Sequence, residues 1–200
     1  VSYAEIFKPQ SATDASKNVL EPVVGYNIET GVKSEFLGGA LNTAVALFQI
    51  IQENRAITDP NNSNYSIAEG KVRSRGIDAE ISGSITERWS VMAGYTFNKS
   101  EYLKSERKTS SNVDYNKGAD AKKYVPRHMF KLYTSYEIPL VGTQKLSIGT
   151  GVRYQSKTSG IYMKDNMSSG SAISYYVPEQ KGYALWDANI NYLINDNFSV

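Results

Sequence analysis

The chain has no cysteine among its 200 residues and only one histidine. The absence of cysteine excludes a disulfide framework and any thiolate metal site. Basic and acidic residues nearly balance, at 22 against 20. The sequence therefore lacks the polybasic footprint of a nucleic-acid-binding protein, and we expect no nucleic-acid partner. It also lacks any apolar run near the roughly 18 residues that a transmembrane helix requires.

Residues that would support catalysis or metal binding are also missing. The single histidine, His128, follows Arg127 at the end of a predicted strand, and we interpret it as an interface residue rather than a metal ligand. Asp59 opens a stretch faintly similar to a calcium loop, but the glycine and the final carboxylate of such loops are absent. Asp78 and Glu80 share one strand face, where we expect polar lining rather than acid–base chemistry. We predict no enzyme activity, no metal site and no cofactor.

What the sequence has in abundance is alternation with a period of two residues. Residues 77–85 put isoleucine, alanine and glycine on one face and acids and serines on the other, and residues 89–97 repeat the pattern after a short polar turn. This period predicts a β-hairpin. Trp89 lies at the turn end of the apolar face, whereas Tyr95 and Phe97 lie at its far end. An apolar middle between two aromatic ends is typical of a strand that crosses a bilayer.

The pattern recurs along the chain. We predict eight strands and the start of a ninth at Phe198, the eight being residues 1–8, 26–36, 41–54, 76–86, 89–102, 128–138, 145–156 and 183–194. Long segments with little periodicity separate alternate pairs, at Pro9 to Gly25, Arg55 to Ser74, Leu103 to Arg127 and Ser156 to Gly182. Loops of about 20 residues are uncommon inside a compact domain. Short turns at one side and long loops at the other are instead typical of an outer-membrane barrel.

The predicted fold class is therefore all-β: a segment of a large antiparallel transmembrane β-barrel with short periplasmic turns and long extracellular loops. A hydropathy scan would miss such a barrel, because its lumen-facing residues are polar. A soluble β-sandwich or a surface adhesin would also alternate. A sandwich, however, gives no reason for aromatic residues at strand ends or for a long connection at every second position, so we favour the barrel.

Several segments resemble TonB-dependent ferric-siderophore receptors, in the order in which that family carries them. They are residues 3–10 (YAEIFKPQ), 20–33 (LEPVVGYNIETGVK), 36–42 (FLGGALN), 70–76 (GKVRSRG) and 124–128 (YVPRH). Within that family, these segments are most similar to receptors for hydroxamate-type or mixed chelates, such as the coprogen, ferrioxamine and pyoverdine receptors. The loops 103–123 and 156–182 are not covered by the resemblance.

The resemblance implies a barrel of about 22 strands, of which this chain supplies about eight, closed by an N-terminal plug. Residues 1–200 would belong to the barrel domain, and the plug, the TonB-contacting region and the barrel termini would lie outside this chain. The implied function is uptake of a ferric siderophore across a Gram-negative outer membrane with energy from TonB, by a monomer. A passive porin or channel and an adhesin-type β protein are the alternatives.

Candidate binding residues follow from this interpretation. A siderophore encloses its iron in its own oxygens, so the receptor recognises the outer surface of the chelate. The iron is therefore transported cargo rather than a cofactor of the receptor. Aromatic rings and a few hydrogen-bond donors suit that surface. By the alternation, four candidates face the lumen at the outer strand ends: Tyr102, Arg153, Gln155 and Tyr183. Others lie in predicted outer loops: Tyr115, Tyr124, Tyr162, Tyr175 and Tyr176. The alternative role of any of these rings is to anchor loops or to pack at the headgroup level.

The predicted loop at residues 104–127 is basic, with seven Lys and Arg residues against three Asp and Glu residues. It could attract anionic chelates by electrostatic steering. It could equally contact the phosphates of outer-leaflet lipopolysaccharide, or be a solvated charge run. The sequence leaves these three roles open.

Overall fold

A computed structural model describes most of the chain. The described residues are 1–59, 62–104, 118, 120–121, 124–159, 163–165, 174–176, 178–195 and 198–200. Among these residues no helix is both long and apolar enough to cross a membrane.

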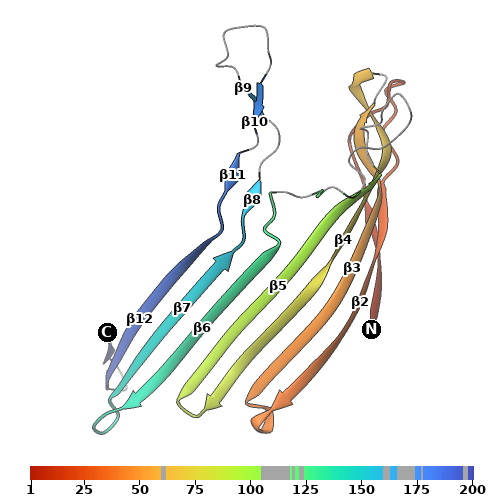
Figure 1. Cartoon of the computed structure of the whole chain (residues 1–200). Coiled ribbons are helices and arrows are strands. Elements are labelled where there is room, and N and C mark those ends of the chain that lie inside the picture. The colour runs from red at the N-terminus through yellow and green to blue at the C-terminus, as the bar shows by residue number, and fades with distance from the viewer. Residues whose placement is uncertain are drawn as a thin grey trace. The chain divides into compact units, whose positions relative to one another are not determined.

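Within this described part, the main sheet has nine strands that pair in chain order (Figure 1). They are β1 (Ser2–Lys8), β2 (Val23–Phe36), β3 (Leu41–Asp59), β4 (Asn62–Thr86), β5 (Trp89–Lys104), β6 (His128–Pro139), β7 (Lys145–Gln155), β12 (Tyr183–Asn195) and β13 (Phe198–Ser199). A short 3-10 turn, η1 (Leu37–Gly39), joins β2 to β3. Two small two-stranded pairs lie between β7 and β12, formed by β8 (Thr158–Ser159) with β11 (Glu179–Gln180) and by β9 (Met163–Asp165) with β10 (Ser174–Tyr176).

All eight predicted strands and the start of the ninth are present, so the all-β prediction is confirmed. The predicted loop from Arg55 to Ser74 is wrong, because β3 continues to Asp59 and β4 begins at Asn62. The extension has polar residues on both faces, and most of its described residues are half-buried or buried on both faces, so one apolar face does not alternate with one polar face. Asn54 has a positive φ of 57°, an irregularity that disturbs the period within β3.

The predicted loop from Ser156 to Gly182 also contains structure that periodicity does not reveal. Its four strands have two or three residues each, too few to establish a period. The pairs Gln180 with Thr158 and Tyr176 with Met163 bring its two arms together.

The chain forms two compact units, described separately below. The first comprises Val1–Thr30, Leu47–Gly76 and Asn98–Lys123, and the second comprises Gly31–Ala46, Ile77–Phe97 and Tyr124–Val200. In the first unit, β1 pairs antiparallel with β2, and the rings of Tyr3 and Tyr26 stack with centroids 6.1 Å apart.

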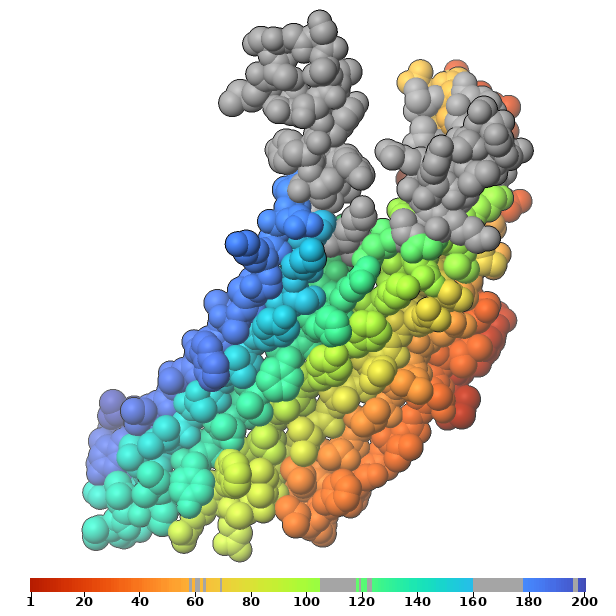
Figure 2. Space-filling view, viewed as in Figure 1, coloured from red at the N-terminus to blue at the C-terminus, as the bar shows by residue number. Residues whose placement is uncertain are grey.

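In the second unit, the register of β5, β6, β7 and β12 confirms the predicted faces. One cross-strand row contains Ala93, Leu132, Val152 and Trp186, and the row beyond it contains Tyr95, Phe130, Tyr154 and Ala184. The apolar face that these rows form is exposed: Trp186 is 75% and Ile190 is 69% accessible. In Figure 2 the side chains of β5, β6 and β7 lie as adjacent bands with no second layer in front of them. The exposed apolar face suits contact with hydrocarbon.

Polar atoms on the apolar face find partners within the sheet. The indole Nε1 of Trp89 donates to Thr134 Oγ1 at 2.8 Å, and that hydroxyl donates to the carbonyl of Ser90 at 2.9 Å. Thr150 Oγ1 donates to the carbonyl of Asp187 at 3.1 Å. Because hydrocarbon offers no hydrogen bonds, such internal pairing is what a lipid-facing hydroxyl requires. From Trp89 to Phe97 the strand rises about 26 Å, or about 20 Å along the membrane normal at a tilt of about 40°, which is close to the apolar band of such barrels.

Candidate functional site

The candidate site lies on the polar face of the second unit, towards the loop-bearing ends of β7 and β12. Tyr183, the first residue of β12, pairs directly with Gln155, the last residue of β7. Gln155 in turn pairs with Met129 of β6. The aromatic ring of Tyr183 and the amide of Gln155 therefore lie in one cross-strand row of the sheet. Both are accessible to solvent, because Gln155 is half-buried and Tyr183 is 39% exposed.

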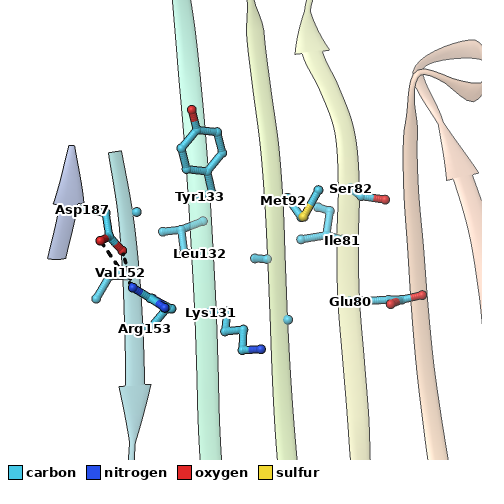
Figure 3. A pocket seen from close by; sticks show the side chains of 13 residues that line it. Glu80, Ile81, Ser82, Met92, Lys131, Leu132, Tyr133, Val152, Arg153 and Asp187 are labelled. Carbon is cyan, nitrogen blue, oxygen red and sulfur yellow. Dashed lines mark hydrogen bonds and ion pairs between the residues drawn. The ribbon is translucent and has the colours of Figure 1, made fainter. Parts of the chain in front are cut away.

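Arg153 lies one row further along β7, on the same face. Its Nη2 donates to the carboxylate of Asp187 on β12, at 3.2 Å to Oδ2 and 3.4 Å to Oδ1. On its other side it pairs in register with Lys131 of β6. Figure 3 shows the Arg153–Asp187 pair with Lys131 and Tyr133 on the neighbouring strand. The carboxylate orients the guanidinium across the wall, while both side chains remain 58% exposed.

Tyr133 forms a second cross-strand contact on this face. Its hydroxyl donates to Asn189 Oδ1 at 3.1 Å, reaching from β6 over β7 to β12. The space for this contact exists because residue 149 is glycine: a Cβ there would overlap both the Tyr133 hydroxyl and the Asn189 amide oxygen. Because Gly149 has no side chain, the side chain of Tyr133 can pass over β7 and reach Asn189 of β12.

An open recess of about 570 Å³ lies on the polar face beside Tyr133 and the Arg153–Asp187 pair, whereas Gln155, Tyr183 and Asn189 do not line it. Residues from β4, β5, β6, β7 and β12 line it, including Glu80, Met92, Lys131, Tyr133, Arg153 and Asp187. Gly94 and Gly151 also line the recess and contribute no side chain to fill it. The recess combines a ring, a thioether and charges of both signs, which suits contact with a ligand or chain segment of mixed polarity.

The structure thus brings together three of the predicted binding residues, Arg153, Gln155 and Tyr183. Tyr102 belongs to the first unit, where it is half-buried in β5 and its carbonyl accepts from Gly118 at 2.8 Å. Tyr124 is 62% exposed just before β6. Tyr115 and Tyr162 lie outside the described residues, and for Tyr175 and Tyr176 the description covers only the backbone pairing of β10 with β9.

Four residues of the site were not singled out from the sequence: Lys131, Tyr133, Asp187 and Asn189. Their alternation placed them on the polar face, but nothing in the sequence indicated which cross-strand partners they meet. Most of the basic loop 104–127 lies outside the described residues, so its three roles stay open. Within the described part, no group of three or more His, Asp or Glu side chains could hold a metal ion.

A family model for the TonB-dependent receptor-like β-barrel matches residues 1–200. The chain belongs to the TonB-dependent receptor family. The resemblance carried by its motifs is thereby confirmed, as is the interpretation as a barrel segment. Members of this family lie in the Gram-negative outer membrane, where the exposed apolar rows of this TonB-dependent receptor chain meet lipid.

Among its relatives is the ferric-pyoverdine M114 receptor of Pseudomonas sp. strain M114, which is 35% identical over 204 residues, covering 100% of this chain and 22% of the relative. The ferrichrome outer membrane transporter and phage receptor of Escherichia coli K12 is 30% identical, over 80% of this chain and 20% of the relative. The solved pyoverdine outer membrane receptor of Pseudomonas aeruginosa PAO1, bound to pyoverdine, superposes with a TM-score of 0.78 at 32% identity, covering 97% of this chain and 27% of that chain. The chain therefore spans about a quarter of the length of the receptors that it matches.

Proposed function

We propose that this chain forms part of the barrel wall of a receptor that binds a ferric siderophore and imports it with energy delivered through TonB. The observation that carries the proposal is the match of the whole chain to receptors named for ferric pyoverdine, at 35% identity. The proposed partners are the ferric siderophore, TonB through a region outside this chain, and the lipids of the outer membrane. We propose that the receptor acts as a monomer and catalyses no reaction.

The chemistry of the polar face supports this proposal. A ferric chelate presents amide, hydroxyl and aliphatic surface, because its own oxygens surround the iron. Tyr183 offers a ring with a hydroxyl, Gln155 offers an amide, and Arg153 offers guanidinium donors held by Asp187. These groups can bind such a surface without contacting the metal. We propose Arg153, Gln155 and Tyr183 as one contact area of the chelate site, with Tyr102, Tyr124, Tyr162, Tyr175 and Tyr176 as further candidates.

Growth of a strain that lacks the full-length receptor tests the function. The strain is supplied with purified ferric pyoverdines, ferrichrome and ferrioxamine as sole iron sources, and the receptor gene is returned on a plasmid. We expect growth on at least one chelate only when the gene is present. Growth on none of them would contradict the siderophore proposal, whereas rescue that persists in a strain without TonB would support a passive channel instead.

The contact area is tested by the double substitution Gln155→Ala with Tyr183→Ala in the full-length receptor. We expect chelate affinity to fall about tenfold or more, because a packed ring and a hydrogen-bonding amide are lost together. The matched control is Ser147→Ala, on the same face of β7 but near the β6–β7 turn, which should leave affinity unchanged. Equal affinities for the double variant and the control would exclude this contact area.

A further inference from the structure

His128, the single histidine of the chain, makes one set of contacts through its ring and another through its backbone. The ring lies against the aromatic residues at the outer end of β5. Its Nδ1 is 2.9 Å from the Tyr95 hydroxyl, and its centroid is 5.0 Å from that of Phe97. Phe97 is also the register partner of His128. A hydrogen bond and a ring contact therefore hold this side chain to β5.

The backbone of His128 contacts Ser156, the residue that follows β7. Ser156 N–H donates to the His128 carbonyl at 2.9 Å, and His128 N–H donates to the Ser156 hydroxyl at 3.1 Å. In a regular antiparallel pair the second bond would go to the Ser156 carbonyl. Because the hydroxyl takes that place, the chain can leave the sheet at Ser156 while the N–H of His128 stays paired. We name these two bonds the Ser156 clamp.

The Ser156 clamp lies directly beside the proposed chelate contact area. Gln155 precedes Ser156 in the chain, and Tyr183 is the register partner of Gln155. Gly182 approaches the same backbone so closely that a Cβ would lie 2.9 Å from the carbonyl oxygen of Gln155 and 3.3 Å from the carbonyl carbon of Ser156. Ser156 is thus enclosed between β6 and the start of β12. A shift of Ser156 would move the two contact residues with it.

Beyond the clamp, the described part of the segment between β7 and β12 is held by weaker contacts. Its strands β8 and β11 contribute two residues each. Glu179 Oε1 accepts from Ser159 Oγ at 3.3 Å and lies 3.8 Å from Lys157 Nζ, and both charged side chains are more than half exposed. Exposed ion pairs of this kind contribute little stability. The clamp is therefore the firmer attachment at the base of this segment.

We propose that His128 is a positioning residue for chelate binding. Its ring is fixed by the aromatic residues of β5, and through the Ser156 clamp its backbone keeps Gln155 and Tyr183 in the geometry that meets the chelate. The inference rests on the proposed function and deepens it, because it assigns a residue that does not touch the chelate. His128 acts before binding, by raising the fraction of receptors whose contact area is already in place. A lower fraction weakens the apparent affinity in proportion.

A positioning role and a contact role predict different binding kinetics. Loss of a contact, as in the variant that combines Gln155→Ala with Tyr183→Ala, speeds dissociation of the chelate. Loss of positioning lowers the fraction of receptors that can bind, so association slows while dissociation is unchanged. A purely structural role of His128 would lower the stability of the barrel and change neither rate.

The test compares Ser156→Val with Ser156→Thr in the full-length receptor. The two new side chains have the same shape, but only threonine retains a hydroxyl that can accept from His128. The probe is whichever of ferric pyoverdine, ferrichrome and ferrioxamine supports growth through the receptor, and binding is followed by stopped-flow quenching of tryptophan fluorescence. A hydrogen bond shifts an equilibrium by about fivefold, so Ser156→Val should associate about fivefold more slowly. Ser156→Thr should behave like wild type.

Tyr95→Phe tests the ring side of His128, because it removes the hydroxyl next to Nδ1 and retains the aromatic ring. We expect association to slow by about two- to fivefold. Combining Tyr95→Phe with Ser156→Val should slow association no further than Ser156→Val alone, since both changes interrupt the same path. The matched control is Tyr136→Phe, opposite Trp89 at the turn end of β6, which should leave both rates unchanged.

Heat-modifiable gel mobility verifies that each variant is folded, and Tyr95→Phe decides alone if Ser156→Val does not fold. Equal association rates for Ser156→Val and Ser156→Thr would overturn the inference, as would an unchanged rate in Tyr95→Phe or faster dissociation in place of slower association. In each of these cases the wild type binds the chelate, so the proposed function stands. A wild-type receptor that binds none of the chelates would contradict the proposed function and the inference together.

Discussion

Three glycines in the strands of the second unit predict a graded series of stability changes on replacement by alanine. Gly94 of β5 has no atom within 4 Å of where a Cβ would lie. Glycine in a strand interior costs about 0.5–1 kcal/mol relative to alanine, so Gly94→Ala should stabilise the barrel by about that amount.

Gly149 of β7 lies beneath the Tyr133–Asn189 hydrogen bond, and a Cβ there would overlap both polar ends. Both are tips of flexible side chains, so they can swing away at the cost of that hydrogen bond, about 0.5–1.5 kcal/mol. The same alanine gain offsets part of this loss. Gly149→Ala should therefore change the free energy of unfolding by less than about 1 kcal/mol.

Gly83 of β4 differs because the atom in the way is backbone. Its φ is +139°, and a Cβ would overlap the carbonyl oxygen of Ala40, which cannot rotate aside. Backbone strain of about 1–3 kcal/mol adds to an overpacking cost of about 1–3 kcal/mol, so Gly83→Ala should destabilise by about 2–6 kcal/mol. The expected order of stability is Gly94→Ala, then Gly149→Ala, then Gly83→Ala.

The assay is urea unfolding of the full-length receptor in lipid vesicles, followed by heat-modifiable gel mobility. Repeating Gly149→Ala in a Tyr133→Phe background removes the hydrogen bond beforehand, so the cost of the alanine should fall by about 0.5–1.5 kcal/mol. A Gly83→Ala receptor as stable as Gly94→Ala would refute the reasoning, because the close approach at Ala40 would then be absent from the folded barrel.

Further predictions concern the two faces of the wall. Asp187→Asn should change stability by less than about 1 kcal/mol, since the Arg153–Asp187 pair is exposed, but it should weaken ferric-chelate binding measured by fluorescence quenching. Unchanged affinity would show that the carboxylate does not position the guanidinium. A lipid-soluble photoreactive probe should label Ile148 and Ile190, and mass spectrometry of peptides that finds neither labelled would place that face away from lipid. Thr134→Val should cost about 1 kcal/mol and shift the fluorescence of the indole that now donates to its hydroxyl, whereas an unchanged spectrum would argue against that bond.

The fold was predictable because the membrane enforces a two-residue period wherever a strand has lipid on one side. The rows that contain Ala93, Leu132, Val152 and Trp186 in the structure are those that the alternation assigned to the apolar face. The constraint disappears where β3 and β4 continue to Asp59 and from Asn62, because most of the described residues there are half-buried or buried on both faces. The extension is also bonded to the segment before β2, since Ala56 N–H donates to Gln10 Oε1 at 3.2 Å and Ser66 N–H donates to the carbonyl of Thr13 at 3.0 Å. Sequence periodicity therefore reports the part of a strand in contact with lipid rather than the whole strand.

The site was less predictable, for a reason that lies in the register. Alternation assigned Arg153, Gln155 and Tyr183 to one face, but it cannot state which residue of β12 stands beside which residue of β7. A tight turn fixes register through its length, whereas β7 and β12 are joined through residues 156–182, a segment too long to do so. The partners Asp187 and Asn189 are set by that register, which shows why only the structure identified them. A slip of two residues between β7 and β12 would preserve every predicted face and yet move Asp187 away from Arg153 and Asn189 away from Gly149. Substitutions at these contacts therefore test the register between β7 and β12 directly. Substitutions chosen from the alternation alone test only which face of the sheet a residue occupies.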